Sequence, residues 1–248
     1  MDAGIMIGCP VRNRAWVLPR YLEHLLHLDY PRHLMQYCFI INDCTDHTAE
    51  ILEEFAARPG IRAQLIYAGK SSPSPLLSFP SPAGHSGPEH RGRYSLPRLA
   101  DLRNTLLQAF LASDCQYLFS VDSDILVPHR ILRDLLADDC QVVSALVCNG
   151  HQLGYSGIYN VLRRVGDYYE FIREFPRDSL FPVDCTGAAY LIRRDVIEDY
   201  GVIYSAEKGG EDIGFCERAA MRGIPLYCDG RLECRHIMKE DLLNIKSK

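Results

Sequence analysis

The chain has 248 residues, of which 47% are apolar, so it can build the core of one α/β domain. Its 27 basic and 32 acidic residues leave a formal net charge of -5 without a long run of like charge, which argues against nucleic acid as a partner. No apolar run is long enough to cross a bilayer, so any membrane contact is expected to be peripheral. The chain opens without a signal segment and its ten cysteines include no Cys-x-x-Cys pair, so we expect reduced thiols and a cytoplasmic location.

Short apolar runs alternate with helical patterns through the first half of the chain. The runs, which predict buried strands, are residues 5–9, 37–41, 64–67 and 117–121. Helices are predicted from Pro at a first turn or from apolar residues at helical spacing, over residues 19–28, around 51–55 and over 97–112. This alternation predicts a parallel sheet wound with helices, in which ligands bind beyond the carboxyl ends of the strands.

Residues 70–96 differ in composition from the rest of the chain. Ser, Pro, Gly and His dominate this segment, and the apolar periodicity is lost. Such a composition predicts a mobile loop, and long loops in compact domains often cover active sites. We therefore expect either a lid or a passive insertion at 70–96.

The second half of the chain continues the α/β pattern with a small antiparallel part. Residues 142–147 and 188–192 are apolar strands, and residues 161–175 predict a hairpin that turns at Gly166 and Asp167. A helix with carboxylates at its positive end is predicted to begin at Glu211. Residues 225–228 and 233–236 are expected to close the fold as two short strands.

Two carboxylates follow the apolar run at 117–121 directly. Asp122, Ser123 and Asp124 are placed at the carboxyl end of a buried strand, where a binding site is expected. Carboxylate oxygens are hard ligands that suit Mg²⁺ or Mn²⁺, and such an ion can bridge the two phosphates of a nucleoside diphosphate. Asp-x-Asp alone is a common turn sequence, so the buried strand before it carries the prediction.

A second acidic pair stands after Gly209 and Gly210. Glu211 and Asp212 can simply cap a helix, but two carboxylates at one helix start can also divide the work of orienting an acceptor hydroxyl and removing its proton. His236, near the end of the chain, offers a nitrogen ligand that is compatible with Mn²⁺ beside a carboxylate.

The loops after the first two strands and one later helix supply candidates for nucleotide binding. The candidates for the base, ribose and phosphates are Pro10, Val11, Arg12, Asn13, Asp43, Arg98 and Arg103, together with Asp122 and Ser123. Neither loop contains a G-x-G-x-x-G or a P-loop sequence, which argues against a dehydrogenase or an ATPase.

Taken in this order, the segments resemble the GT-A glycosyltransferases, particularly the family 2 type. The resemblance covers the Pro10 to Asn13 loop, Asn42 to Asp46, Arg103-Asn104, the Asp122-Ser123-Asp124 motif, Glu211-Asp212 and His236. Arg103-Asn104-Thr-Leu-Leu together with the Asp-x-Asp motif is also similar to the Anp1-type mannosyltransferases, which retain the anomeric configuration where family 2 inverts it.

The resemblance implies a fold, a cofactor and residue roles. The fold is GT-A, a Rossmann-like mostly parallel sheet flanked by helices with a small antiparallel acceptor-side region, in one domain over residues 1–248. Residues 1–128 would bind the nucleotide sugar and residues 129–248 would face the acceptor. Asp43 would contact the base, Asp124 and His236 would bind Mn²⁺ or Mg²⁺ with Asp122 beside them, and Asp212 would act as the base with Glu211 positioning the acceptor.

The sequence therefore predicts a metal-dependent glycosyltransferase that moves a sugar from a UDP- or GDP-sugar to an acceptor hydroxyl on a glycan, a lipid-linked acceptor or a small molecule. Inversion with Asp212 as base is the expected mechanism. A retaining Anp1-like enzyme, a nucleotidyltransferase and a catalytically silent binder of sugar nucleotides remain the alternatives.

Overall fold

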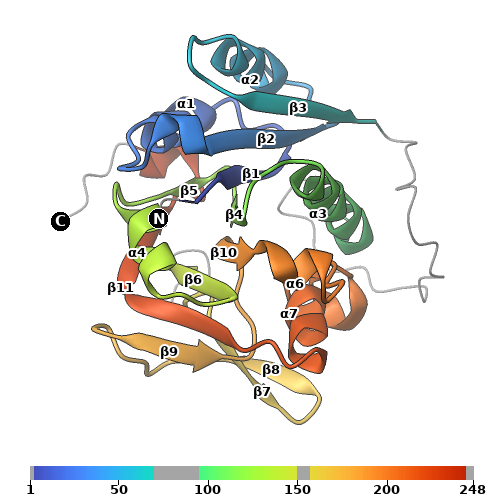
Figure 1. The fold of residues 1–248 in the computed structure, drawn as a ribbon, viewed down its shortest axis with the longest axis vertical. Helices are drawn as coiled ribbons and strands as arrows, with labels where there is room; N and C mark the ends of the chain where they lie inside the picture. Colours follow the sequence, from blue (N-terminus) through green and yellow to red (C-terminus); the bar gives the residue numbers. More distant parts are fainter. Residues whose placement is uncertain (1–2, 70–94, 150–156, 244–248) are drawn as a thin grey trace.

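A computed structural model describes residues 3–69, 95–149 and 157–243 of the chain (Figure 1). The predicted loop at 70–96 falls outside the described residues except at its last two positions. There Ser95 accepts a hydrogen bond from the backbone N–H of Arg98 and caps the following helix.

The first half of the chain builds a parallel sheet, as its alternating pattern predicts. The parallel strands are β1 (Ile5–Val11), β2 (Met35–Asn42), β3 (Ala63–Ala68) and β4 (Tyr117–Val121), in the spatial order β3-β2-β1-β4. The helices that connect them are α1 (Leu18–Leu26), α2 (Thr48–Ala56) and α3 (Leu96–Leu111). Because these strands run in one direction, the loops after β1, β2 and β4 open at one edge of the sheet.

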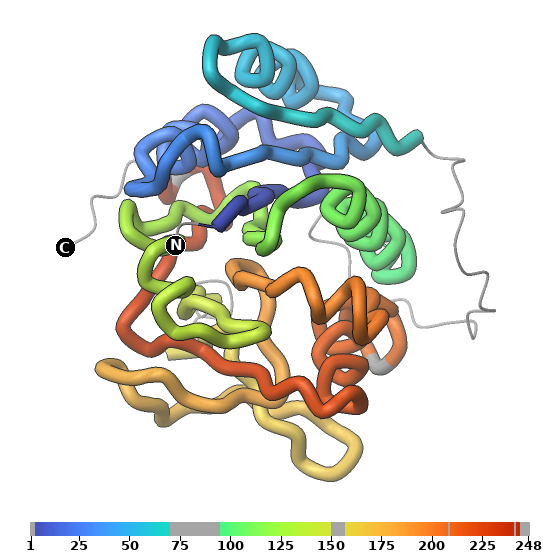
Figure 2. The backbone as a smooth tube through the Cα atoms, in the orientation of Figure 1, coloured from blue at the N-terminus to red at the C-terminus, as the bar shows by residue number. Residues whose placement is uncertain are grey.

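The second half extends this sheet beyond β4 in mixed directions. Its strands are β5 (Ile125–Leu126), β6 (Val142–Val147), β9 (Leu180–Val183), β10 (Ala189–Arg193) and β11 (Leu226–His236), and its helices are α4 (Ile131–Ala137), α6 (Arg194–Glu198) and α7 (Glu211–Met221). Strand β10 is inserted antiparallel between β4 and β6. Figure 2 shows most of the first half of the chain at one end of the molecule and most of the second half at the other. Strands β4 and β10 pair between them.

Two layers of apolar side chains cover the two faces of the sheet. Helices α1, α2 and α4 bury Tyr21, Phe55 and Leu132 in one layer. Helices α3, α6 and α7 bury Leu106, Val196 and Phe215 in the other, and Figure 1 shows these three helices on the same side. Phe55 and Leu106 are among the positions that helical spacing predicts to form apolar faces, and both are buried against the sheet.

A separate hairpin confirms the turn predicted at Gly166. Strands β7 (Leu162–Val165) and β8 (Tyr168–Phe171) pair antiparallel, and Gly166 adopts a φ of 63° in the turn. Glycine favours this left-handed conformation because it carries no Cβ atom.

One prediction about the end of the chain is wrong. Residues 225–228 and 233–236 were expected as two strands, whereas β11 runs unbroken from Leu226 to His236 with a register shift between Asp229 and Glu233. Its first part pairs with β9 and β6, and its last residues pair with β5. A Cβ atom on Gly230 would lie 1.9 Å from the Pro176 carbonyl oxygen, so a glycine is required where the strand bends.

All ten cysteines are unpaired in the structure, as expected from their spacing. Within the described residues, none of the helices combines the length and the apolar character that a membrane crossing requires.

Candidate functional site

The turn after β4 brings the Asp-x-Asp motif next to the end of β11. Asp124 and His236 are neighbours because β5 pairs with β11, His236 opposite Ile125, and the Ile237 N–H donates to the Asp124 carbonyl at 2.8 Å. His236 Nε2 lies 3.6 Å from Asp124 Oδ1, and its Nδ1 contacts Asn149 Oδ1 at 3.0 Å. The structure thus brings together the two residues predicted to bind the ion.

Positive groups around Asp124 favour its charged form. Burial alone would raise the pKa of Asp124, but the hydrogen bond with His236 and the charges of His236 and Arg14 lower it below its ordinary value. Arg14 Nη2 approaches Asp124 Oδ2 at 3.4 Å. Asp124 therefore carries a negative charge at neutral pH.

Asp122 faces a different partner. Its carboxylate accepts a hydrogen bond from Arg103 Nη2 at 2.8 Å, and its backbone N–H donates to the Ala188 carbonyl at 2.9 Å. Burial raises the pKa of Asp122, with the charge of Arg103 opposing this effect. Ser123, between the two aspartates, is buried.

Arg103 was predicted to bind phosphate, and the structure surrounds it with carboxylates. Besides Asp122, its Nε donates to Glu211 Oε1 at 3.1 Å and lies 4.0 Å from Asp212 Oδ1. Its side chain is only 3% exposed. The two acidic motifs that the sequence places about ninety residues apart therefore share one guanidinium group.

Asp212 occupies the inner end of α7. Tyr190 donates to its Oδ1 at 3.1 Å, and the ring hydroxyl of Tyr190 is itself hydrogen-bonded to that of Tyr204. A Cβ atom on Gly187 would lie 2.1 Å from Asp212 Oδ2, which explains the glycine. Burial raises the pKa of Asp212 to about 7, with Arg103 lowering it and Glu211 and Asp122 raising it further. A carboxylate with this pKa can exchange a proton near neutral pH.

The loops after β1 and β2 are joined to one another. Asn13 Oδ1 accepts from the Thr45 N–H at 2.8 Å, and the Arg14 N–H donates to Thr48 Oγ1 at 2.7 Å. Asn13 and Asp43 both have positive φ angles, 49° and 47°, which turn the chain sharply at the strand ends. These contacts form a continuous rim at the edge of the sheet.

The other predicted nucleotide-binding residues differ in how far their side chains are exposed at the edge of the sheet. Val11 is 1% exposed, so its side chain belongs to the core, while Pro10, Arg12 and Asp43 are half-buried at the rim. Arg98 lies beside β3, where its guanidinium donates to Asn42 Oδ1 at 3.1 Å and to the Ala68 and Gly69 carbonyls.

Sequence reasoning missed three side chains of this site. Arg14 and Asn149 contact the Asp124-His236 pair, and Tyr204 is hydrogen-bonded to Tyr190 beside Asp212. Arg14 directly follows the predicted 10–13 loop and could have been included with it. Tyr204 gave no signal, because an aromatic residue in an apolar segment usually indicates packing.

The donor set at Asp124 fits Mn²⁺ or Mg²⁺ in its chemistry. The Asp124 carboxylate and the His236 imidazole, whose side chains are 16% and 11% exposed, suit a divalent ion such as Mn²⁺. Among the described residues, no group of three or more His, Cys, Asp or Glu side chains is already arranged to enclose an ion. Oxygen atoms of a ligand or of water would have to complete the coordination.

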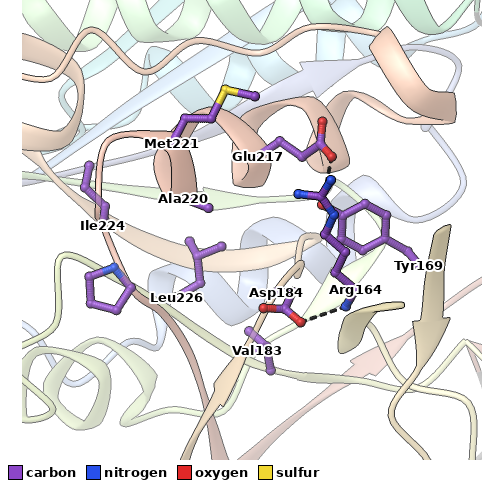
Figure 3. A pocket seen from close by; sticks show the side chains of 10 residues that line it. Arg164, Tyr169, Val183, Asp184, Glu217, Ala220, Met221, Ile224 and Leu226 are labelled. Carbon is purple, nitrogen blue, oxygen red and sulfur yellow. Dashed lines mark hydrogen bonds between the residues drawn. The ribbon is translucent and has the colours of Figure 1, made fainter. Parts of the chain in front are cut away.

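A second depression lies away from this site, between the outer end of α7 and the hairpin. It has a volume of about 350 Å³ and is lined by Val183, Asp184 and Leu226 from the sheet side and by Met221 from α7. Figure 3 shows Tyr169 and Glu217 pointing toward one another there, joined by a hydrogen bond of 3.1 Å.

Comparison with known proteins identifies relatives across most of the chain. The chain is 24% identical over 194 residues to procollagen galactosyltransferase 2 of Homo sapiens, covering 76% of this chain and 30% of that protein. It is 26% identical over 174 residues to inactive glycosyltransferase 25 family member 3 of Homo sapiens, covering 69% and 28%. It is also 27% identical over 147 residues to the mannan polymerase II complex anp1 subunit of Schizosaccharomyces pombe, covering 56% and 34%. The matched part is thus about a third or less of each relative's length.

Solved structures confirm the GT-A fold. The structure of S. aureus TarS 1-349 in complex with UDP-GlcNAc matches 100% of this chain and 62% of its own, with a TM-score of 0.59 and 14% identity. The mannosyltransferase PcManGT from Pyrobaculum calidifontis, in complex with GDP-Man and Mn²⁺, matches 96% and 58%, with a TM-score of 0.58 and 17% identity.

The family model described as glycosyltransferase family 25, N-terminal domain, matches residues 3–227. The match includes both acidic motifs and ends before His236. The chain therefore belongs to the family defined by the N-terminal domain of glycosyltransferase family 25.

Proposed function

We propose that this protein transfers a sugar from a nucleoside diphosphate sugar to an acceptor hydroxyl, with the help of a divalent metal ion. The observation that carries the proposal is the convergence of Asp124 and His236 with Asp122, Arg103 and Asp212 at the carboxyl edge of the sheet. The family match and the nucleotide-sugar complexes of the structural neighbours support the same activity. They favour it over the nucleotidyltransferase alternative.

In this proposal the ion is held by Asp124 and His236, with Asp122 close by. When bound, Mn²⁺ or Mg²⁺ would supply a Lewis acid for the charge that grows on the departing nucleoside diphosphate. Asp122 is held toward the donor by Arg103, and Arg14 supplies positive charge beside Asp124. The rim formed by residues 10–13 and by Asp43 is placed to hold the base and ribose.

Asp212 acts on the acceptor side as the base, and Glu211 orients the acceptor hydroxyl. Gly187 leaves room for the Asp212 carboxylate, while Tyr190 fixes one of its oxygens by a hydrogen bond. Direct attack by the deprotonated hydroxyl would invert the anomeric configuration. The relationship to the anp1 subunit keeps a retaining mechanism as the second candidate.

The similar proteins suggest which donors and acceptors to test first. UDP- and GDP-sugars are the first to test, because the neighbouring structures contain UDP-GlcNAc and GDP-Man. A galactosyl donor and a collagen-like acceptor join the panel because of the name of the human procollagen relative. A lipid-linked or small-molecule acceptor, the cytoplasmic location and the division into donor and acceptor halves at residue 128 remain predictions.

Substitution of Asp212 by Asn tests the function and its main rival together. An enzyme is expected to keep donor binding in D212N and to lose at least about 100-fold in transfer rate, because the amide cannot accept a proton. The rival is a protein that binds sugar nucleotides without catalysis, which the name of the inactive human relative suggests. Such a protein would show no transfer in the wild type or in D212N. NMR of the product's anomeric configuration separates inversion from retention, and full transfer by D212N would overturn the assignment of the base.

A further inference from the structure

The guanidinium group of Arg103 contacts side chains from three separate parts of the fold. Arg103 lies on α3, and its Nη1 donates to Ser120 Oγ on β4 at 3.2 Å. Its Nη2 donates to Asp122 at 2.8 Å and its Nε to Glu211 at 3.1 Å. One planar group therefore joins the helix before the Asp-x-Asp motif, the motif itself and the start of α7.

The surroundings of Arg103 leave little of it for a substrate. Its side chain is 3% exposed, each of its three nitrogens already donates to a protein oxygen, and the face of its guanidinium lies 5.6 Å from the centre of the Tyr204 ring. A residue that binds the donor phosphates would have to release these partners. The burial argues that Arg103 acts on protein groups.

The guanidinium group of Arg103 holds several carboxylates close together. One positive group faces three carboxylates, because Asp212 Oδ1 is also within 4.0 Å of Nε. Three like charges at close range repel one another, and the fixed fork of a guanidinium can hold them at defined angles where an ammonium group cannot. The adjacent Asn104 reinforces the arrangement, since its side chain pairs with both the N–H and the carbonyl of Tyr204.

We propose that Arg103 is a positioning residue that sets the distance between the donor-side Asp122 and the acceptor-side pair Glu211 and Asp212. It does so by binding Asp122 and Glu211 at the same time. The acceptor hydroxyl is then held where it can attack the donor sugar from the side opposite the departing nucleoside diphosphate. This inference rests on the proposed transferase function. It assigns to Arg103 a coupling role in place of the phosphate contact expected from the sequence.

The ratio of transfer to donor hydrolysis tests this role. Hydrolysis of the donor, in which water takes the sugar from the nucleoside diphosphate, needs only the donor side, whereas transfer needs both sides in register. Arg103→Lys keeps the charge but loses the fork. We expect transfer to fall about 100-fold, the size of effect that a misplacement near 1 Å can produce, with the ratio falling at least about tenfold and the donor KM changing less than about threefold.

Matched variants keep the result interpretable. Arg194→Lys is the control, because Arg194, the first residue of α6, is also a multiply bonded arginine. It donates to the carbonyls of Leu111, the last residue of α3, and of Ser113 and Cys115 beyond it. The R194K variant should leave the ratio unchanged. Ser120→Ala removes the acceptor of Nη1 together with the hydrogen bond between Ser120 and Tyr204, and keeps the contacts of Arg103 with the carboxylates. It should lower the ratio in the same direction by a smaller factor, which gives a second measurement where R103K yields less folded protein.

Two outcomes would overturn the proposal. An R103K enzyme with an unchanged ratio and a much weaker donor affinity would make Arg103 a phosphate-binding residue. An equal loss of transfer and hydrolysis in R103K and R194K would make its role one of general stability. A wild-type protein that binds no sugar nucleotide and transfers nothing would instead refute the proposed function, so the two failures are separable.

Discussion

Asp212 combines burial with three charged neighbours, and this makes its chemistry dependent on pH. Burial is the largest cause that raises the pKa of Asp212 to about 7; Arg103 opposes it, while Glu211 and Asp122 add to it. Only the ionised form accepts a proton, so kcat is expected to be low below pH 7 and to rise through about pH 7 to a plateau. The measurement is kcat for transfer between pH 5.5 and 9 at saturating donor, acceptor and Mn²⁺.

Donor affinity over the same pH range is the control. It reports on the ion and the nucleotide, which do not require Asp212 to be ionised. A kcat that stays level from pH 5.5 to 9, or that only follows donor affinity, would contradict the role of Asp212 as base.

A second buried carboxyl group, Asp138, has no part in the proposed chemistry and affects stability. Arg231 donates to Asp138 Oδ1 at 2.7 Å and also to both oxygens of the fully buried Asp229. Among the described residues, Asp138 Oδ2 is the buried side-chain oxygen that lacks a hydrogen-bond partner. Burial and the neighbouring Asp229 raise the pKa of Asp138 to about 6, with Arg231 opposing them.

This raised pKa predicts that Asp138→Asn stabilises the protein. A group whose pKa is raised by folding contributes stability that is fully present below its ordinary value of 3.8 and is lost as pH rises through about 6. Asn cannot ionise, so its advantage should grow by about 3 kcal/mol as pH rises from about 4 through 6, and should then stay level. Urea unfolding of both forms at pH 4, 5, 6 and 7.5 measures it.

The neighbouring Asp139 provides the matched control for D138N. Asp139 is exposed and has a φ of 49°, a conformation that Asn also tolerates, so D139N makes the same charge change without burial. It should give no gain that grows with pH. A loss of stability in D138N at pH 7.5 would show that the contact with Arg231 outweighs burial of the charge.

At the scale of elements, the entry to β10 fits closely against the start of α7. Gly187 approaches the Asp212 carboxylate, and Ala188 adopts a φ of 66° while its carbonyl accepts from Asp122. Strained residues of this kind are often found in active sites. The turn from Gly187 to Ala188 contacts both Asp122 and Asp212, the two acids to which the proposed function gives donor-side and acceptor-side roles.

Gly187→Ala is expected to lower transfer more than stability. The new Cβ atom would lie 2.1 Å from Asp212 Oδ2, so the carboxylate must move, and a displacement of this kind can reduce kcat by about 100-fold. Steady-state kinetics and urea unfolding of the same preparation separate the two effects. Gly69→Ala is the control, since no atom lies within 4 Å of its Cβ position.

An unchanged kcat in G187A would mean that Asp212 can be displaced without consequence. That result would count against its role as base.

The elements that could be predicted are those defined by local pattern. The strand at 117–121, the α7 start at Glu211 and the turn at Gly166 all follow from apolar runs, caps and turn residues. The unbroken course of β11 could not be predicted, because it depends on three partner strands from distant parts of the chain. The insertion of β10 between β4 and β6 is equally a property of the assembled sheet.

At the scale of the whole molecule, the sequence predicted which residues belong to the candidate site but not which side chains they contact. Asp124 and His236 could be grouped because the family order pointed to them, and the structure places them 3.6 Å apart. The partners of Arg103 could not be predicted, since helical spacing shows only that it is a polar position on α3. Its contacts with Ser120 and Glu211 come from residues 17 and 108 positions away.

The whole chain is expected to bind its donor as an intact domain, and this gives the broadest test. A nucleotide that binds the folded state at 100 times its Kd adds about 2.7 kcal/mol of stability. For a chain of this size each kcal/mol raises Tm by roughly 2–4 °C. The measurement is Tm with UDP, GDP, UDP-GlcNAc or GDP-mannose, each with and without Mn²⁺. We expect the ligands with one of the two bases, uracil or guanine, to raise Tm by several degrees when Mn²⁺ is present, and the ligands with the other base to leave Tm unchanged.

Asp124→Asn is the variant that connects this shift to the site. It removes the anionic oxygen beside His236 and Arg14, so it should abolish the part of the shift that depends on Mn²⁺, while the exposed D139N leaves that part intact. If Asp124 holds the ion beside the diphosphate, removing its charge should remove the ion-dependent part of the shift and leave the ion-independent part. Equal shifts with and without Mn²⁺ in the wild type would remove the metal from the mechanism, and would leave the positive charge of Arg14 to hold the diphosphate.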